Sequence, residues 1–183
     1  MKKRTIGILI CTLAIVFVFS ACGQSSDTTS ETDATTAAAD YTAQGEQALA
    51  NAQELASTIN EDDIKGMLEA NTEHCDQAKN IEKAIDAYMK DHEEITYAYV
   101  IRYKDGSKKA AEFLVNWEDT DEYWGEDFEL YDEATRALNG EAVYDKEPTT
   151  DEDGTVITGY APIKIDGDVA IVVCVDYAVE EAE

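Results

Sequence analysis

The sequence predicts an α+β domain in which N-terminal helices pack on an antiparallel sheet of about five strands. Three observations lead to this prediction. Apolar residues recur at spacings of three and four over residues 42–88, which is the period of an amphipathic helix. From residue 95 onward, apolar and polar residues alternate in runs rich in β-branched and aromatic side chains, as in strands. Asp105-Gly106 and Asp166-Gly167 separate such runs and favour hairpin turns.

A basic start and an apolar run precede this domain. Lys2, Lys3 and Arg4 lead into an apolar run from Ile6 to Phe19. The run has about 14 residues, fewer than the roughly 20 that a membrane-spanning helix needs. Such a run, ending in small residues, is typical of the apolar region of a secretory signal peptide. We therefore predict that residues 1–21 are a signal peptide.

The residues at the end of the apolar run are Ser20-Ala21-Cys22-Gly23. Small residues directly before a cysteine resemble the lipobox of bacterial lipoproteins, although Phe19 stands where that family prefers leucine. The resemblance implies that Cys22 is acylated and becomes the first residue of the mature chain. The alternative is an uncleaved membrane anchor with an incidental cysteine. Both interpretations tether the remaining residues at the outer face of the bacterial cytoplasmic membrane.

A segment rich in Ser, Thr, Asp and Ala follows over residues 22–40. This composition buries too little apolar surface to offset the entropy of ordering the chain, so we predict a flexible stalk. Fully extended, about 18 residues reach about 60 Å. The stalk leads to residues 41–183, whose length is typical of one globular domain.

The chain is strongly acidic. It has 14 Lys and Arg against 40 Asp and Glu, a formal net charge of −26. Residues 1–21 contain three of the basic residues and none of the acidic ones, so the remainder carries 11 against 40, or −29. Nucleic acids and anionic lipid surfaces bind basic patches. We therefore exclude nucleic acid as a partner and expect membrane contact through the lipid on Cys22.

Two cysteines, Cys75 and Cys174, remain once the signal peptide is removed and Cys22 is acylated. They either form one disulfide or remain small buried side chains, and both alternatives stay open. No CxxC or HExxH motif is present, and His74 and His92 are not spaced as a local ligand pair. We therefore expect no transition-metal site and no cofactor.

Three helices are predicted in the first third of the domain. The first covers about residues 42–58, the second follows a capping Asn60, and the third ends near Asp91-His92. Acidic residues 61–63 favour the start of the second helix because they lie at its positive end. The residues expected to face the core are Ala48, Ala52, Leu55, Ile59, Ile64, Met67, Leu68, Ala78, Ile81, Ile85 and Tyr88.

A hairpin is predicted next, with strands over residues 95–104 and 109–116 and a turn over residues 104–107. Alternation places two sets of side chains on opposite sides of the first strand: Tyr97, Tyr99, Ile101 and Tyr103 against Ala98, Val100 and Arg102. In the second strand it places Ala111, Phe113 and Val115 against Glu112, Leu114 and Asn116.

The second half of the domain is predicted to contain a loop, a helix and three strands. Residues 117–124 form the loop, and residues 127–138 form a helix that stops at Asn139-Gly140. The apolar residues of that helix are Leu130, Ala134, Ala137 and Leu138. The remaining elements are a short strand over 141–145, a turn over 151–154, and two strands over 155–165 and 169–177.

This order of elements, together with short sequence segments, resembles the Cache sensor domains of bacterial receptors over residues 41–178. The segments are LASTINEDDIKGML, ITYAYVIRYKDG, YWGEDF, ALNGEAV and GTVITGYAPIKIDGDVAIVVCVDYA. The resemblance implies a long helix beside a PAS-like antiparallel sheet, and a small molecule held between the sheet and its covering loops. Asn116 stands where an aspartate is common in the family, and residues 170–174 replace a glycine-containing run.

A half-buried sheet beside an aromatic loop predicts a small-molecule site. Trp117, Tyr123 and Trp124 offer aromatic walls, and ligand pockets combine such walls with a few fixed polar groups. For any single ring, the alternative is that it completes the core. The residues expected to line the site are Tyr99, Asn116, Trp117, Trp124, Tyr131, Tyr144, Thr158, Tyr160 and Asp176.

Several charged residues have alternative roles. Arg102 either anchors a ligand carboxylate or pairs with Glu112 across the hairpin, and the second role is favoured. Asp176 either binds an amine or ends a strand. The carboxylates of residues 118–133 either join nearby aromatic rings in a site for an amine or polyamine, or form a solvated acidic face. Neither this stretch nor residues 151–154 has the ligand spacing of an EF-hand.

No catalytic motif is present. The sequence has no GxSxG segment and no phosphate-binding glycine loop, so we expect no enzyme. We expect no output domain after Tyr177. We therefore expect a tethered protein that binds an extracellular amino acid, amine or small carboxylate and presents it to a separate membrane receptor or transporter. The alternative is a protein-docking or structural module of the cell envelope without a small-molecule ligand.

Overall fold

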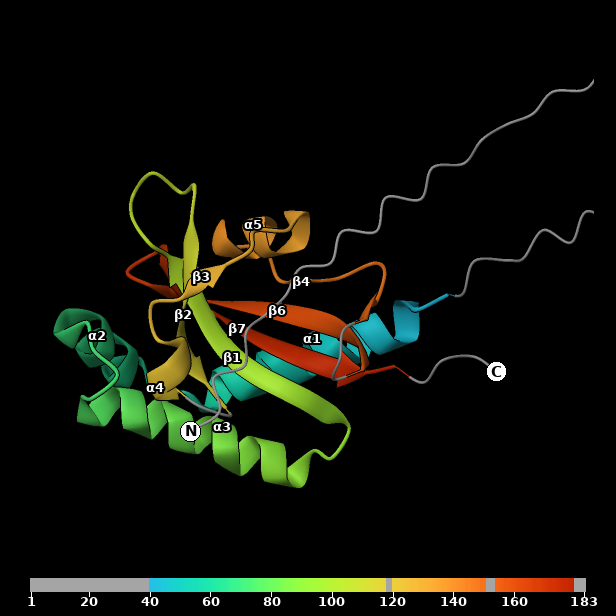
Figure 1. The fold of residues 1–183 in the computed structure, drawn as a ribbon, viewed down its shortest axis with the longest axis horizontal. Coiled ribbons are helices and arrows are strands. Elements are labelled where there is room, and N and C mark those ends of the chain that lie inside the picture. The colour runs from blue at the N-terminus through green and yellow to red at the C-terminus, as the bar shows by residue number, and fades with distance from the viewer. Residues whose placement is uncertain (1–39, 118–119, 151–153, 180–183) are drawn as a thin grey trace, which may run out of the picture. The chain divides into compact units, whose positions relative to one another are not determined.

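The structure, a computed structural model, describes residues 40–117, 120–150 and 154–179. The predicted signal peptide, Cys22 and the predicted stalk up to residue 39 lie outside this part of the chain. The helices are α1 (Thr42–Thr58), α2 (Glu61–Ala70), α3 (Asp76–Asp91), α4 (Thr120–Tyr123) and α5 (Asp132–Leu138) (Figure 1). The strands are β1 (Ile95–Tyr103), β2 (Ala111–Asn116), β3 (Asp127–Phe128), β4 (Val143–Tyr144), β5 (Thr149–Thr150), β6 (Thr155–Ile165) and β7 (Asp168–Ala178).

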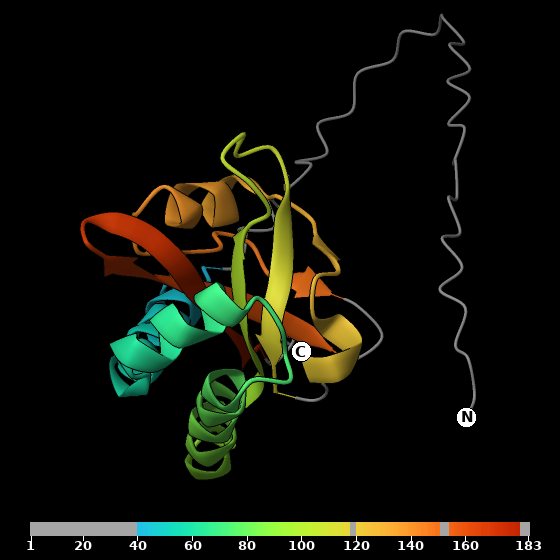
Figure 2. The ribbon, with the colours of Figure 1, turned by 90° about the vertical axis from the view of Figure 1, so that its left-hand side faces the viewer.

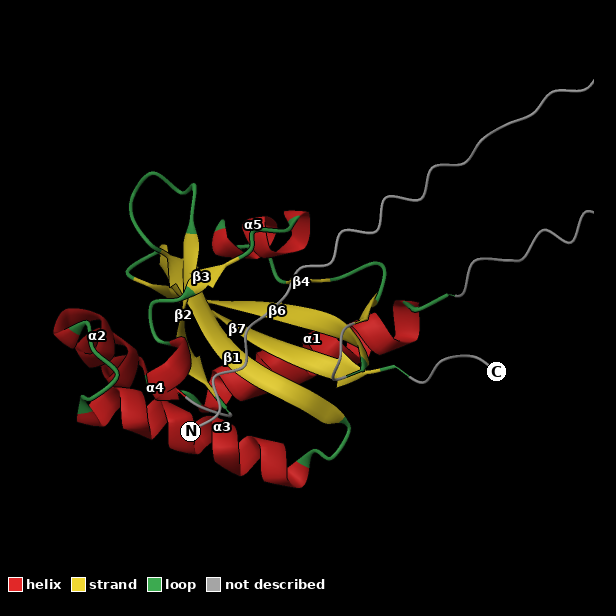
Figure 3. Cartoon of the chain, in the orientation of Figure 1, coloured by secondary structure: helices red, strands yellow, loops and turns green. Residues whose placement is uncertain are grey.

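The strands form one antiparallel sheet in the order β3-β2-β1-β7-β6-β4, and β5 pairs with β6. Helices pack on this sheet (Figure 3), so the predicted α+β class is confirmed. The five predicted strands correspond to β1, β2, β4, β6 and β7. The sequence did not predict β3, whose residues were assigned to a helix, or β5, whose residues were assigned to no element.

The N-terminal helices agree with their prediction. α1 has the predicted bounds, and its buried residues include Ala48, Ala52 and Leu55. α2 begins after the predicted cap Asn60, whose Oδ1 accepts a hydrogen bond from the backbone N–H of Asp62 at 2.7 Å. The caps and the apolar stripes are local features of the sequence, which is why these boundaries could be predicted.

The two cysteines of the domain are free thiols. Cys75 caps α3, where its Sγ accepts a hydrogen bond from the backbone N–H of Ala78 at 3.3 Å. Cys174 is buried in the central strand β7. The sequence left open whether these two cysteines form a disulfide. In the structure they do not, and both remain free thiols.

The predicted helix over residues 127–138 is wrong in its first part. Asp127 and Phe128 instead form β3, which pairs with Glu112 and Ala111 of β2, and α5 begins only at Asp132. Pairing with the open edge of β2 satisfies backbone groups that an edge strand leaves exposed. Phe128 is also buried against the sheet, which the helical alternative would not allow at this position.

A β-bulge in the β1–β2 hairpin changes the predicted faces of β2. The register shifts in the middle of β1, so that Leu114 is an extra residue in β2. Leu114 and Val115 both pack in the core beneath the helices, and Asn116 pairs with Tyr99 on the opposite face. The predicted alternation, which placed Val115 with Phe113 and Asn116 with Leu114, is wrong at this point.

The two faces of the sheet are covered differently (Figures 1 and 2). α1 and α3 cover one face, which we call the α1–α3 face, and α2 packs on α3. Its buried strand residues are Ala98, Val100, Leu114, Val115, Ala161, Ile171, Val173 and Val175. The short helix α5 covers the opposite face, which we call the α5 face. Its buried strand residues are Tyr99, Ile101, Ala111, Phe128, Val143, Tyr160, Val172 and Cys174.

Helix α1 lies directly on β6 at Gly159. A Cβ atom at this position would overlap the backbone of Ala48 and Leu49, so the close approach depends on the absence of a side chain. Near its N-terminus, α1 makes a similar contact at Gly45, over which the ring of Tyr144 lies. Within the described ranges, no helix is long and apolar enough to cross a membrane.

Candidate functional site

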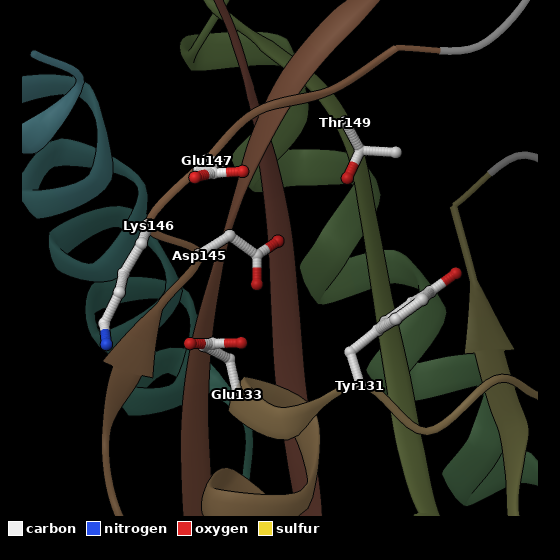
Figure 4. A pocket seen from close by; sticks show the side chains of 6 residues that line it. All are labelled: Tyr131, Glu133, Asp145, Lys146, Glu147 and Thr149. Atoms are coloured by element: carbon white, nitrogen blue, oxygen red, sulfur yellow. The ribbon is translucent and has the colours of Figure 1, made fainter. Parts of the chain in front are cut away.

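A cavity of about 310 Å³ lies beside α5, between the start of that helix and the chain that follows β4 (Figure 4). It is lined by Tyr131, Glu133, Asp145, Lys146, Glu147 and Thr149. In Figure 4, the Tyr131 ring and the Thr149 hydroxyl lie across the space from Glu133, Asp145 and Glu147. Small-molecule sites span roughly 300–1,000 Å³, so this cavity has the size for a small ligand.

Asp145 connects the cavity to the buried α5 face. Its Oδ2 accepts a hydrogen bond from the Tyr160 hydroxyl at 3.3 Å. Its backbone N–H donates to the Thr158 carbonyl at 2.9 Å, which continues the β4–β6 pairing by one residue. Because Tyr160 is buried, the carboxylate is positioned by a fixed hydroxyl on one side and borders the cavity on the other.

A second carboxylate, Asp176, lies on the neighbouring strand β7. Its Oδ1 accepts hydrogen bonds from the Thr158 hydroxyl at 2.8 Å and from the Tyr99 hydroxyl at 3.5 Å. Thr158 and Tyr99 are both buried. Since Thr158 contacts Asp176 through its side chain and Asp145 through its backbone, it links the two carboxylates in one polar network across β4, β6 and β7.

Burial changes the titration of this network. Burial raises the pKa of Asp145 to about 6, although hydrogen bonds from Tyr160 and Thr158 act in the opposite direction. Burial also raises the pKa values of the Tyr99 and Tyr160 hydroxyls and of the Cys174 thiol. These three groups are therefore neutral at pH 7.

Aromatic rings extend from the sheet to the cavity. The ring centroids of Tyr99 and Phe113 are 5.5 Å apart, those of Phe113 and Phe128 are 5.3 Å apart, and those of Phe128 and Tyr131 are 6.2 Å apart. Inclined contacts of this kind are favourable between aromatic rings. Tyr131 is 49% exposed, so its ring is anchored on Phe128 and still forms an accessible wall of the cavity.

Most of the predicted lining residues lie on the α5 face or at the cavity. Tyr131 lines the cavity itself. The predicted residues that the strand register places on the α5 face are Tyr99, Asn116, Thr158, Tyr160 and Asp176. The bulge in β2 is what moves Asn116 to this face, because its pairing partner is Tyr99.

Three predicted lining residues lie elsewhere. Trp117 lines a separate cavity beside α3, and its ring centroid is 6.2 Å from that of Tyr97. Trp124 packs against the core of the α1–α3 face. Tyr144 pairs with Gly159 and lies over Gly45 of α1, since neighbouring residues of a strand point to opposite faces.

Sequence reasoning missed most of the residues that line the cavity. They are Asp145, Lys146, Glu147 and Thr149, whereas Glu133 belongs to the acidic segment 118–133 that was predicted either to bind an amine or to be a solvated face. The missed residues occur in short acidic and turn-like segments without periodicity, so nothing distinguished them from solvated surface. A signal existed for Asp145: once β4 is aligned with β6, the residue after Tyr144 is opposite Thr158 and shares its face.

Arg102 has the favoured one of its two predicted roles. Its Nε is 2.7 Å from Glu112 Oε1, and its Nη2 donates to Asn71 Oδ1 at 2.6 Å. Both contacts are remote in the fold from the residues that line the cavity beside α5. In the part of the chain that the structure describes, no three His, Cys, Asp or Glu side chains are grouped so that they could hold a metal ion.

Comparison with known proteins finds similarity only among solved structures. No family profile matches the chain, and no curated protein is similar to it. The chain is similar to the ligand-binding domain of the Campylobacter jejuni chemoreceptor Tlp3. The complex with 4-methylisoleucine has a TM-score of 0.41 and 17% identity, covering 73% of this chain and 59% of that one. The complex with L-valine has a TM-score of 0.36 and 17% identity, covering 73% and 60%. The chain thus spans about three fifths of the length of the structures that it matches.

Proposed function

We propose that this chain is a bacterial surface lipoprotein whose Cache-like domain binds an extracellular small molecule in the cavity beside α5. The observation that carries the proposal is a cavity of about 310 Å³ whose wall contains Asp145, a carboxylate hydrogen-bonded to the buried Tyr160. An aromatic wall combined with a few fixed polar groups is the usual construction of a small-molecule site. The sequence resemblance to Cache domains supports the same assignment.

The lining favours a ligand that carries a protonated amine. Three carboxylates border the cavity, and Asp145 is positioned in advance by Tyr160 and Thr158. The ring of Tyr131 lies across the same cavity (Figure 4), and a cation–π contact between such a ring and a bound ammonium group contributes about 0.5–2 kcal/mol. Among the ligand classes predicted from the sequence, these features support amino acids and amines over small carboxylates.

The proposal is tested by ligand-dependent thermal unfolding of the full-length protein in detergent. The panel contains amino acids, amines and small carboxylates. A ligand that binds only the folded state adds about 2.7 kcal/mol at one hundred times its dissociation constant, which raises the unfolding midpoint by several degrees. We expect a shift from an amine-bearing compound, and we expect Tyr131→Ala to reduce it.

Trp117→Ala is the matched control, because Trp117 is also an exposed aromatic side chain but lines the separate cavity beside α3. The proposed site requires that this variant keep the shift. A shift that disappears in Trp117→Ala and persists in Tyr131→Ala would move the binding site to α3. No shift from any compound would favour a protein-docking module.

We also propose that Cys22 carries the lipid anchor and that the domain presents its ligand to a separate membrane receptor or transporter. The lipobox-like segment and the strongly acidic remainder of the chain support anchoring by lipid rather than by a charged protein surface. Metabolic labelling with an alkyne fatty acid tests the first part: the wild-type protein should be labelled and Cys22→Ser should not. An unlabelled wild-type protein would exclude the lipoprotein assignment.

A further inference from the structure

We propose that the cavity beside α5 selects organic dications, such as short diamines, over α-amino acids. This inference rests on the proposed function, because it assumes that the cavity is the ligand site. It adds the chemical class of the ligand, which follows from how charge is distributed around the cavity and from the wall that faces it.

The lining of the cavity carries an excess of acidic over basic side chains. Glu133, Asp145 and Glu147 reach the cavity from three separate positions, namely the first turn of α5, the residue after β4 and the connection to β5. Lys146 is the one basic residue of the lining, and its ammonium group points toward α1, away from Thr149 and Tyr131 (Figure 4). A bound molecule therefore meets more than one unit of negative charge.

Within the described residues, no ion pair neutralises these carboxylates. Arg136 interacts electrostatically with Glu133, but its guanidinium is paired with Glu141 at 2.6 Å. No ion pair joins Glu133, Asp145 or Glu147 to a described lysine, arginine or histidine. Lys146 instead borders a neighbouring cavity with Leu49 and Arg136. Carboxylates grouped around one space repel each other, and an added cation between them relieves this repulsion.

An α-amino acid carries a carboxylate in addition to its ammonium group. Such a ligand needs a donor for its own negative charge, as arginine and lysine provide in carboxylate sites. Apart from Lys146, the side-chain donors of the lining are the hydroxyls of Thr149 and Tyr131. In Figure 4 the Tyr131 hydroxyl points away from the lining carboxylates, and it already donates to Glu129 at 3.2 Å. A zwitterionic amino acid would thus place its own carboxylate near Glu133 and Asp145, with no cationic group to offset the repulsion. A diamine instead places a second ammonium group near these carboxylates.

The opposite wall of the cavity also suits a diamine. Tyr131 presents its ring to the space and is held in place by the edge of Phe128, with an interplanar angle of 85°. The methylene chain of a diamine can pack on this ring while each ammonium group reaches a carboxylate. The raised pKa of Asp145 agrees with a carboxylate that lacks a cation at this position.

The test is ligand-dependent unfolding of the full-length protein in detergent, with 1,4-diaminobutane, n-butylamine, L-valine and 1,4-butanediol as probes. We expect a saturable rise of the midpoint with 1,4-diaminobutane, a weaker one with n-butylamine, and none with L-valine or the diol. Glu133→Gln and Asp145→Asn should each weaken diamine binding at least tenfold. Glu147→Gln, which changes an exposed side chain, serves as a further cavity variant if Asp145→Asn does not fold.

A strongly acidic protein attracts dications without a site, so the control must remove the same charge elsewhere. Glu69→Gln does so on the exposed surface of α2, and it should leave diamine binding unchanged. If all variants including Glu69→Gln bind the diamine as the wild-type protein does, the attraction is nonspecific and the inference is overturned.

The remaining outcomes separate the inference from the proposed function. If L-valine raises the midpoint as much as the diamine and the cavity variants abolish both shifts, the cavity is the site but the ligand class is wrong. If no probe raises the midpoint, and the amino acids, amines and carboxylates of the wider panel also fail, both the inference and the proposed function are overturned.

Discussion

The two faces of the sheet are built from the same strands but have different chemistry. The α1–α3 face is covered by long helices, and its strand residues in the core are aliphatic. The α5 face is covered by a helix of seven residues, and its buried side chains include Tyr99, Thr158, Tyr160 and Cys174. The difference shows how one sheet separates two tasks: the first face supplies the apolar burial that stabilises the fold, and the second holds polar groups in fixed positions.

Single strands illustrate this separation. In β6, Gly159 admits α1 on one face while Thr158 and Tyr160 carry the polar network on the other. In β7, Val175 and Asp176 are adjacent and face opposite sides. Because successive side chains of a strand alternate, residues one position apart should respond very differently to substitution.

The largest effect is expected in the core of the α1–α3 face. Leu55→Ala removes a fully buried side chain and should lower the free energy of unfolding by about 2–5 kcal/mol. Denaturant unfolding measures this change. A loss of less than about 1 kcal/mol would contradict the assignment of this face as the main source of stability.

The next effect concerns the close approach of α1. Gly159→Ala places a methyl group where the backbone of Ala48 and Leu49 lies, so α1 must move outward. Overpacking of this kind costs about 1–3 kcal/mol. Gly106→Ala, at a position with open space around it, is the control in the same unfolding experiment. Equal stability of the two variants would mean that α1 does not contact β6 as described.

A polar substitution on the α5 face should have an effect of similar or smaller size but a different cause. Thr158→Val keeps the shape of the side chain and removes the donor to Asp176. Loss of a buried hydrogen bond to a charged group costs about 1–3 kcal/mol. Ligand binding by both variants distinguishes the two faces further. Thr158→Val should weaken ligand binding, whereas Leu55→Ala, measured at a temperature below its unfolding midpoint, should bind the ligand as the wild-type protein does.

The pH dependence of stability should report Asp145. Its pKa in the folded protein is raised to about 6 from 3.8, so the folded state binds the proton more tightly than the unfolded state. The contribution of Asp145 to the free energy of unfolding therefore decreases as the pH rises from about 4 to about 6, and is constant above that range. Glu133, from α5, adds to this shift, while the hydroxyls of Tyr160 and Thr158 oppose it.

The measurement is the difference in unfolding free energy between the wild-type protein and Asp145→Asn across this pH range. With allowance for solvent screening at a partly exposed group, we expect a change of about 1 kcal/mol. The variant cannot titrate at this position, so its stability should fall less as the pH rises. A difference independent of pH would show that Asp145 has an ordinary pKa.

The smallest effect on stability is expected at the cavity wall. Tyr131 is 49% exposed, and Tyr131→Ala should change the free energy of unfolding by less than about 1 kcal/mol. The same substitution should nevertheless reduce ligand binding. A variant that is stable and no longer binds would separate the two tasks most clearly, whereas a large loss of stability would assign Tyr131 to the core.

Much of the fold could be predicted because its signals are local. The bounds of α1, the Asn60 cap of α2 and the turn at Asp166-Gly167 depend on periodicity and on conformations that few residues adopt. In the structure, Asp166 and Gly167 have φ values of 55° and 94°, as a tight hairpin requires. The features that were missed or misplaced, β3, β5 and the bulge in β2, depend on how one strand pairs with another, and periodicity within a single strand does not report this pairing.

The candidate site was predicted less completely for the same reason. Tyr99, Thr158, Tyr160 and Asp176 could be placed near each other because they occur on long strands with clear alternation. Trp117 and Trp124 could not, because their positions depend on the path of the loop after β2.

By itself, the sequence determined the class of the fold and most of the helix and strand boundaries, and it led to the expectation of a tethered domain that does not bind nucleic acid. These conclusions depend on composition, on spacing within one element and on short motifs. Only the tertiary structure decided that Cys75 and Cys174 stay unpaired, that Asn116 turns to the α5 face, and that Asp145 borders a cavity with Tyr131. Each of these depends on which residues the fold brings together from separate elements, and local sequence patterns do not encode such contacts.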